Sequence, residues 1–122
     1  MKCLIINNSH YITTLIIKIL NELGHTECDV FKEGVSIEDT LIIGEYSFLI
    51  CDAESTDRTV FNILASIRGD EKIRTMKILI LKEIMGKTLI DKIQESVYSS
   101  YLIKPFTPSL LREKIKGLLL VD

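Results

Sequence analysis

Short apolar runs alternate with longer amphipathic runs along the chain. The short runs have the length of buried strands, and we expect five of them, at residues 2–6, 27–31, 47–51, 76–81 and 101–103. The longer runs carry apolar residues at helical spacing, and we expect five helices, at residues 11–23, 36–43, 58–68, 87–97 and from 107 or 108 onward. Ser9 is expected to cap the first helix, and Phe61 and Val97 are expected on the inward sides of the third and fourth helices. Each predicted strand is therefore followed by one predicted helix.

This alternation predicts an α/β fold. Strands that are apolar on both sides and joined by helices favour a five-stranded parallel sheet with helices on both faces. With 122 residues and no internal linker or repeat, the chain is expected to form a single domain over residues 1–122. Right-handed connections place the carboxyl ends of all parallel strands at one edge, where sites form in open sheets. We therefore look for chemistry at the strand ends.

The composition removes several classes of function. A net charge of −2 and an isoelectric point near 5.7 leave no basic surface for a phosphate backbone, so we expect no direct binding of nucleic acid. No apolar run approaches the roughly 18 residues of a membrane span. The cysteines Cys3, Cys28 and Cys51 are expected to be small buried residues in a reducing compartment. We therefore expect a cytoplasmic protein that makes no membrane contact.

The sequence offers little that favours an enzyme. His10 and His25 lie apart and are expected to be solvated, and Ser9 beside His10 lacks a third group to orient it. No glycine-rich phosphate loop follows the first predicted strand, and a flavin site would rest on fold analogy alone. We therefore expect a protein that is not an enzyme.

Polar residues stand where the predicted strands end. Asn7 and Asn8 follow the first strand, Asp52 the third, Lys82 the fourth, and Lys104 ends the fifth before a proline. Together with the segments YSFLICD and KPFTPSLL, this layout resembles the receiver domains of bacterial response regulators, typified by the chemotaxis receiver. The resemblance covers the whole chain. It implies a flavodoxin-like topology with strand order 2-1-3-4-5 and a cis peptide bond between Lys104 and the proline.

The resemblance also implies roles for individual residues. Asp52 matches the phosphoacceptor, Lys104 matches the lysine that contacts the phosphoryl group, and Tyr101 matches the aromatic switch residue that changes rotamer on activation. Asn7 and Asn8 occupy the positions of the family's acidic pair. The pair that holds the metal in the family is therefore replaced by amides in this chain.

Two further positions bear on the site. Lys82 occupies the place of the family's Thr/Ser switch residue, and Glu54 falls where the family supplies a backbone carbonyl to the metal. The family's metal positions are thus Asn7, Asn8, Asp52 and Glu54 in this chain. We expect Lys82 to reach Asp52 and form an ion pair, or else to project into solvent along its flexible stem.

These replacements weaken the expected Mg²⁺ site. In the family, three carboxylates and one lysine carry a charge of −2, which one Mg²⁺ neutralises. Here Asp52, Lys82 and Lys104 sum to +1, or to zero if Glu54 turns inward. At an effective dielectric constant of about 20, each unit-charge contact near 4 Å is worth about 4 kcal/mol. We therefore expect Mg²⁺ to bind weakly or not at all, and we expect no other cofactor.

The most favoured function is that of an atypical receiver module in two-component (phosphorelay) signal transduction. Such a module acts through contacts with signalling proteins, either a histidine kinase or an output partner, and Mg²⁺-dependent phosphorylation of Asp52 is expected to be impaired or absent. The alternative is a working phosphoacceptor that a histidine kinase phosphorylates on Asp52. A third possibility is slow phosphorylation without metal, with Lys82 compensating the charge.

The resemblance also points to a surface. The fourth helix, fifth strand and fifth helix form the family's usual dimer or partner face, and here this face is expected to carry Tyr98, Tyr101, Arg112 and Lys116. A homodimer or a docking surface at this face and an ordinary solvated face are both open from the sequence.

Overall fold

The structure is a computed structural model that describes residues 2–25, 27–32 and 34–122. Within these ranges, five parallel strands form one sheet in the order β2-β1-β3-β4-β5. The strands are β1 (Lys2–Ile6), β2 (Glu27–Val30), β3 (Phe48–Asp52), β4 (Lys77–Lys82) and β5 (Ser99–Ile103). The helices are α1 (His10–Glu22), α2 (Ile37–Ile43), α3 (Val60–Arg68), α4 (Lys87–Gln94) and α5 (Pro108–Leu119), and a 3-10 helix, η1 (Ala53–Ser55), follows β3. The predicted fold class and strand order are confirmed.

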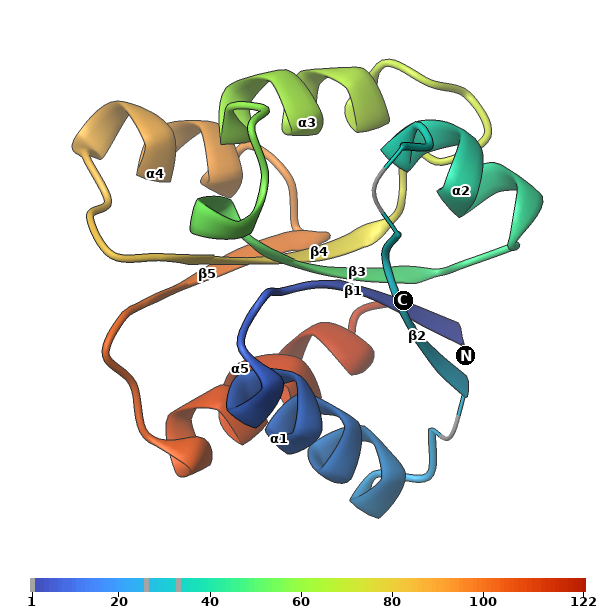
Figure 1. Ribbon diagram of the computed structural model, residues 1–122. Coiled ribbons are helices and arrows are strands. Elements are labelled where there is room, and N and C mark those ends of the chain that lie inside the picture. The colour runs from blue at the N-terminus through green and yellow to red at the C-terminus, as the bar shows by residue number, and fades with distance from the viewer. Residues whose placement is uncertain (1, 26, 33) are drawn as a thin grey trace.

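Helices cover the sheet on both faces (Figure 1). One face is covered by α1 and α5, and the other by α2, α3 and α4. Successive residues of β3 alternate between the two sides: Leu49 and Cys51 belong to the core formed with α2, α3 and α4, whereas Phe48 and Ile50 pack with α1 and α5. Every residue of β3 is buried, so this central strand is enclosed on both faces, as its unbroken apolar sequence predicts.

Hydroxyl side chains fix the starts of two helices that flank the strand ends. The Ser9 hydroxyl accepts a hydrogen bond from the Ile12 N–H at 3.2 Å at the start of α1. The Thr107 hydroxyl accepts one from the Leu110 N–H at 3.1 Å, and Pro108 is the first residue of α5. The predicted Ser9 cap is confirmed. These caps anchor the loops that follow β1 and β5, where candidate site residues lie.

The boundaries differ from the predicted ones mainly around α4 and β5. α4 ends at Gln94 rather than at residue 97, and β5 begins at Ser99 rather than at residue 101. Val97, which was predicted to face the core, is 72% exposed because the chain has already left the helix. In α3, Ile63 is buried whereas Phe61 is 41% exposed, so the predicted inward position of Phe61 is wrong.

The three cysteines are free thiols. Cys3 and Cys51 are buried, as predicted, whereas Cys28 is half-buried because it lies on β2, an edge strand. Burial raises the pKa of Cys51 to about 12, so this thiol stays protonated near neutral pH.

No helix in the described residues has both the length and the apolar character needed to pass through a bilayer. The longest of these helices, α1, has 13 residues, whereas a spanning helix needs about 20. α1 is also amphipathic, with Ile16, Ile19 and Leu20 buried and Lys18 exposed.

Candidate functional site

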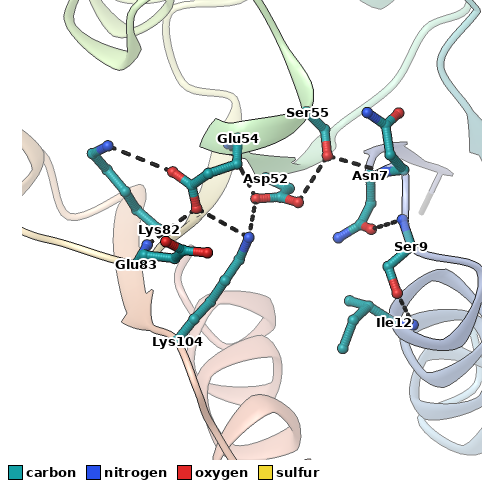
Figure 2. Close-up of polar contacts among 10 residues, drawn as sticks. Asn7, Ser9, Ile12, Asp52, Glu54, Ser55, Lys82, Glu83 and Lys104 are labelled. Carbon is teal, nitrogen blue, oxygen red and sulfur yellow. Dashed lines mark hydrogen bonds and ion pairs between the residues drawn. The ribbon is translucent and has the colours of Figure 1, made fainter.

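The ends of four strands meet at one edge of the sheet (Figure 2). Asn7 directly follows β1, Asp52 ends β3, Lys82 ends β4 and Lys104 directly follows β5. Glu54 joins them from η1. The structure thus brings together the residues that the sequence placed at the strand ends, and hydrogen bonds and ion pairs connect the two acids to the two lysines.

Asp52 is enclosed by donors from its own chain. Its side chain is almost fully buried, with the residue only 6% exposed. One carboxylate oxygen accepts from the Ser55 hydroxyl at 2.8 Å. The other accepts from the Glu54 N–H at 3.2 Å and from the Lys104 ammonium group. Both oxygens of the expected phosphoacceptor are therefore engaged.

Lys104 serves two carboxylates at once. Besides Asp52, its ammonium group donates to Glu54 Oε1 at 3.0 Å. Partial burial alone would lower the pKa of Lys104, but the hydrogen bonds and negative charges of Asp52 and Glu54 outweigh burial and raise it above its ordinary value. Lys104 is therefore a permanent cation at neutral pH.

Lys82 pairs with Glu54, and the predicted ion pair between Lys82 and Asp52 is wrong. The Lys82 Nζ lies 3.5 Å from Glu54 Oε2, and none of the ion pairs among the described residues joins Lys82 to Asp52. The physical reason is that the Glu54 side chain, which starts from η1, extends between Lys82 and Lys104 (Figure 2), while Lys104 already neutralises Asp52. Glu54 also accepts from the Glu83 N–H at 3.1 Å.

The Asn7 amide is oriented by its local turn. Asn7 is only 8% exposed, and its Oδ1 accepts a hydrogen bond from the Ser9 N–H at 2.7 Å. Its Nδ2 is buried and has no hydrogen-bond partner in the described part of the chain. The carbonyl oxygen of the Asn7 side chain is therefore used within the turn, and the group left without a partner in the described part of the chain is the Nδ2 donor.

Ser55 links two of the strand ends. Its hydroxyl donates to Asp52 at 2.8 Å and accepts from the Asn8 N–H at 3.0 Å, which connects the loop after β1 to the end of β3. The sequence analysis did not select Ser55 as a site residue. A hydroxyl three residues after a strand-ending aspartate is the signal that could have found it.

Replacing Ser55 by alanine is expected to lower the free energy of unfolding by about 1 kcal/mol, because the Asp52 carboxylate and the Asn8 N–H each lose a partner. Urea unfolding followed by circular dichroism measures this change. Ser109→Ala, on the exposed side of α5, is the matched control and is expected to stay within about 0.5 kcal/mol of wild type. Equal losses in the two variants would contradict the bridging role.

A cleft of about 610 Å³ lies beside this cluster, and Asn8, Phe31, Glu38 and Arg58 are among the residues that line it. Arg58 and Glu38 form an ion pair across 2.6 Å. Burial alone would raise the pKa of Glu38, but hydrogen bonds from its own backbone, from Arg58 and from Ser36 bring it below the ordinary value. The pair fastens the start of α2 to the segment before α3.

No protein-family model matches the chain, but the chain is similar to several known proteins. The chemotaxis protein CheY of Pseudomonas aeruginosa is 27% identical over 116 residues, which cover 95% of this chain and 94% of the relative. A chemotaxis protein CheY homolog of Campylobacter jejuni is 28% identical over 120 residues, covering 98% and 92%. Among solved structures, a putative response regulator from Chloroflexus aurantiacus has a TM-score of 0.77 at 21% identity, with 98% of each chain covered. The chain is thus similar to CheY proteins over nearly its whole length, and it has the fold of the solved response regulator. Its strand order and its paired helix layers are those of the receiver fold.

Tyr101 is half-buried on β5 and packs against the core formed with α2, α3 and α4. The Lys114 ammonium group lies 5.3 Å from the centre of its ring, within the range of a cation–π contact. Arg112, which was expected on the same face as Tyr101, instead pairs with Glu22 of α1 at 2.7 Å, whereas Lys116 is exposed. The peptide bond before Pro105 is cis, as the resemblance implies.

The charges of the receiver-type site cancel within the chain. The carboxylates of Asp52 and Glu54 face the ammonium groups of Lys82 and Lys104, so the sum is zero, the lower of the two values expected from the sequence. Across the described residues, no group of three or more His, Cys, Asp or Glu side chains is placed to hold a metal ion. The cluster is an ion-pair network rather than a set of free carboxylates.

Proposed function

We propose that this chain is an atypical response-regulator receiver module that acts in the cytoplasm through protein contacts rather than as an enzyme, with Mg²⁺-dependent phosphorylation of Asp52 impaired or absent. The observation that carries this proposal is the charge balance at the strand ends. Lys104 neutralises Asp52, and Lys82 together with Lys104 neutralises Glu54, so little attraction remains for a dication.

The oxygen atoms near Asp52 do not fit the needs of Mg²⁺. This hard cation prefers an octahedron of oxygen ligands and is usually held by one or two carboxylates. The Asn7 carbonyl oxygen is used by the Ser9 N–H, and the Asp52 oxygens accept from Ser55, Glu54 and Lys104. Binding of Mg²⁺ would have to break several of these contacts without a compensating gain in charge.

The same contacts reduce the reactivity of Asp52 toward a phosphodonor. A carboxylate oxygen must present a lone pair to phosphorus, and hydrogen bonds from an ammonium group and a hydroxyl stabilise the lone pairs on both oxygens. The low exposure of Asp52 also limits the approach of a donor. Both effects favour a module whose Asp52 is a structural partner of Lys104.

For partners, we propose signalling proteins, either a histidine kinase or an output protein, that dock on the face formed by α4, β5 and α5. The names of the curated relatives support a signalling role. The apolar side chains of Val97 and Ile103, which are 72% and 45% exposed, lie on or beside this face. A homodimer through the same face is the other form of this proposal, and sedimentation velocity over a range of concentrations distinguishes the two.

The test of the proposed function is incubation with a small phosphodonor such as acetyl phosphate, or with beryllofluoride, in the presence and absence of Mg²⁺. We expect no Mg²⁺-dependent gain of intact mass and no Mg²⁺-dependent change in the backbone amide spectrum. Asp52→Asn sets the background for addition at other residues. A Mg²⁺-dependent mass gain that disappears in Asp52→Asn would overturn the proposal and favour the working phosphoacceptor that a histidine kinase phosphorylates.

A further inference from the structure

A small pocket lies at the edge of the sheet opposite the one that holds Asp52. It has a volume of about 180 Å³ and is lined by Leu64, Arg68, Lys92, Glu95, Ser96 and Ser99. These residues come from α3, from α4 and the two residues that follow it, and from the start of β5. The helices α3 and α4 lie side by side over the same face of the sheet (Figure 1). Asp52 ends β3 whereas Ser99 begins β5, so the parallel strands separate the pocket from the strand-end cluster.

Arg68, the last residue of α3, carries a charge that no carboxylate in the described part of the chain neutralises. Its guanidinium group donates to the carbonyls of Arg74 and Met76, at 2.9 and 2.7 Å, and to the Ser99 hydroxyl. None of the ion pairs among the described residues includes Arg68. Its Nε is buried without an acceptor in the same residues, and burial lowers the pKa of the guanidinium group. An anion beside Arg68 would therefore stabilise its charged form.

Two hydroxyl groups that line the pocket have donors to spare. The Ser96 hydroxyl accepts from the Tyr98 N–H at 3.1 Å, and the Ser99 hydroxyl accepts from Arg68. Neither hydroxyl donates to an acceptor among the described residues. A hydroxyl can accept and donate at the same time, so both remain able to donate to a ligand.

The lining residues carry an excess of positive charge. Arg68 and Lys92 contribute +2 and Glu95 contributes −1, so the sum is +1. The Lys92 ammonium group pairs with Glu95 at 3.0 Å, which uses one of its three donors. The Glu95 side chain is 63% exposed, compared with 34% for Lys92. The pocket thus lacks one negative charge and has more donors than acceptors.

We propose that this pocket binds a small carboxylate, which accepts hydrogen bonds from Lys92, Ser96 and Ser99 and neutralises Arg68. A carboxylate carries the single negative charge that the lining residues lack, and its two oxygens accept from up to four donors. A volume of about 180 Å³ has room for about six water molecules, which suits a group the size of acetate. The carboxylate belongs either to a free acid or to an acidic side chain of a partner protein. This inference goes beyond the proposed function, because the pocket shares no residue with the strand-end cluster.

The experiment is titration of the ¹⁵N-labelled protein with sodium acetate at neutral pH, with sodium chloride adjusted to keep the ionic strength constant. The backbone amides of Ser96 and Ser99 and the Nε–H of Arg68 report binding. We expect saturable shifts of these three signals with a dissociation constant of about 1–10 mM, because a ligand of so few atoms can gain only a small binding free energy. The absence of saturable shifts would overturn the inference, and so would equal shifts when chloride alone is titrated.

Substitutions on α4 locate the binding site. Lys92→Met should weaken acetate binding at least about fivefold, because a cation that donates to the ligand is removed. Lys87→Met is the matched control: it removes another lysine of α4 that pairs with a carboxylate, that of Asp91 at 2.8 Å, but the Lys87 side chain is 89% exposed and does not line the pocket. This control should bind acetate within about twofold of wild type. Equal weakening in the two variants would contradict the proposed site.

A further variant and a second ligand complete the test. If Lys92→Met is poorly folded, Glu95→Gln replaces it and should tighten acetate binding, since it removes the one negative charge among the lining residues; unchanged or weaker binding would overturn the inference. The second ligand is glutamate with an acetylated amino group and an amidated α-carboxyl group. Binding of this ligand at least as tightly as acetate assigns the pocket to an acidic side chain of a partner, and tighter binding of acetate assigns it to a free acid. Because no Mg²⁺ or phosphodonor is present, these outcomes are independent of the assay for the proposed function.

Discussion

A variant with Asn7→Asp, Asn8→Asp and Lys82→Thr is expected to bind Mg²⁺ at least about 100-fold more tightly than the wild-type protein, a difference of about 3 kcal/mol. In this variant, four carboxylates and the single ammonium group of Lys104 stand at or near the strand ends, whereas in the wild type the charges cancel. Each added unit-charge contact with a cation is worth several kcal/mol at an effective dielectric constant of about 20, and repulsion between the carboxylates consumes part of it.

The geometry of Asn7 makes this gain specific. An aspartate at position 7 keeps one oxygen for the Ser9 N–H and places its second oxygen where the Asn7 Nδ2 now lies buried without a partner in the described part of the chain. The substitution thus replaces an unsatisfied donor with a metal ligand. Lys82→Thr removes the cation that holds Glu54 on one side.

Calorimetric titration with MgCl₂ measures the affinity of the triple variant. The control is Lys82→Thr alone, which removes one positive charge but adds no carboxylate, and it should give a small fraction of the gain. If the triple variant binds Mg²⁺ no more tightly than this control, charge is not what limits the wild-type site, and the proposed reason for impaired phosphorylation fails.

The topology was predictable because it depends on patterns that span whole elements. Five apolar runs separated by helical runs leave few arrangements open, and the parallel register then fixes which residues share an edge. Asp52, Lys82 and Lys104 follow directly from this rule, since each lies at or directly after a strand end.

The pairing within the site was not predictable from the same patterns. It depends on which carboxylate reaches which ammonium group, and that choice is made by η1, a turn of three residues that leaves no periodic trace in the sequence. The turn directs Glu54 between the two lysines and leaves Asp52 to Lys104 and Ser55. A position that the resemblance marked for its backbone carbonyl therefore acts through its side chain.

The orientation of the Asn7 amide was less predictable than the topology but more predictable than the pairing of the lysines. Asparagine often accepts a hydrogen bond from the backbone N–H two residues later, and here the Ser9 N–H is that donor. The sequence contained this signal, since Asn7 precedes a helix cap by two residues. This hydrogen bond changes the chemistry of the site, because the Asn7 side chain then has only its amide nitrogen, a donor, free to contact a ligand, and not its oxygen.

The alanine variant of Phe48 is expected to lose about 3–5 kcal/mol of unfolding free energy. Phe48 is fully buried at the start of β3 and packs in the core between the sheet and the helices α1 and α5. Truncation removes its apolar contacts and leaves a cavity, because a central strand paired on both sides cannot move to fill it. Urea unfolding monitored by circular dichroism measures the loss, and a variant that is unfolded without urea also meets the prediction, since domains of this size have about 5–15 kcal/mol in total.

The same substitution at Phe61 is the matched control and is expected to cost less than half as much. Phe61 lies on α3 with 41% of its surface exposed, so its truncation returns less apolar area to water and leaves no enclosed cavity. The comparison also decides between two assignments of the inner face of α3, because the helical pattern of the sequence alone placed Phe61 inward. If Phe61→Ala destabilised the protein as much as Phe48→Ala, α3 would have to present Phe61 to the core. The side of α3 that packs on the sheet would then differ from the one formed by Ile63, Leu64 and Ile67.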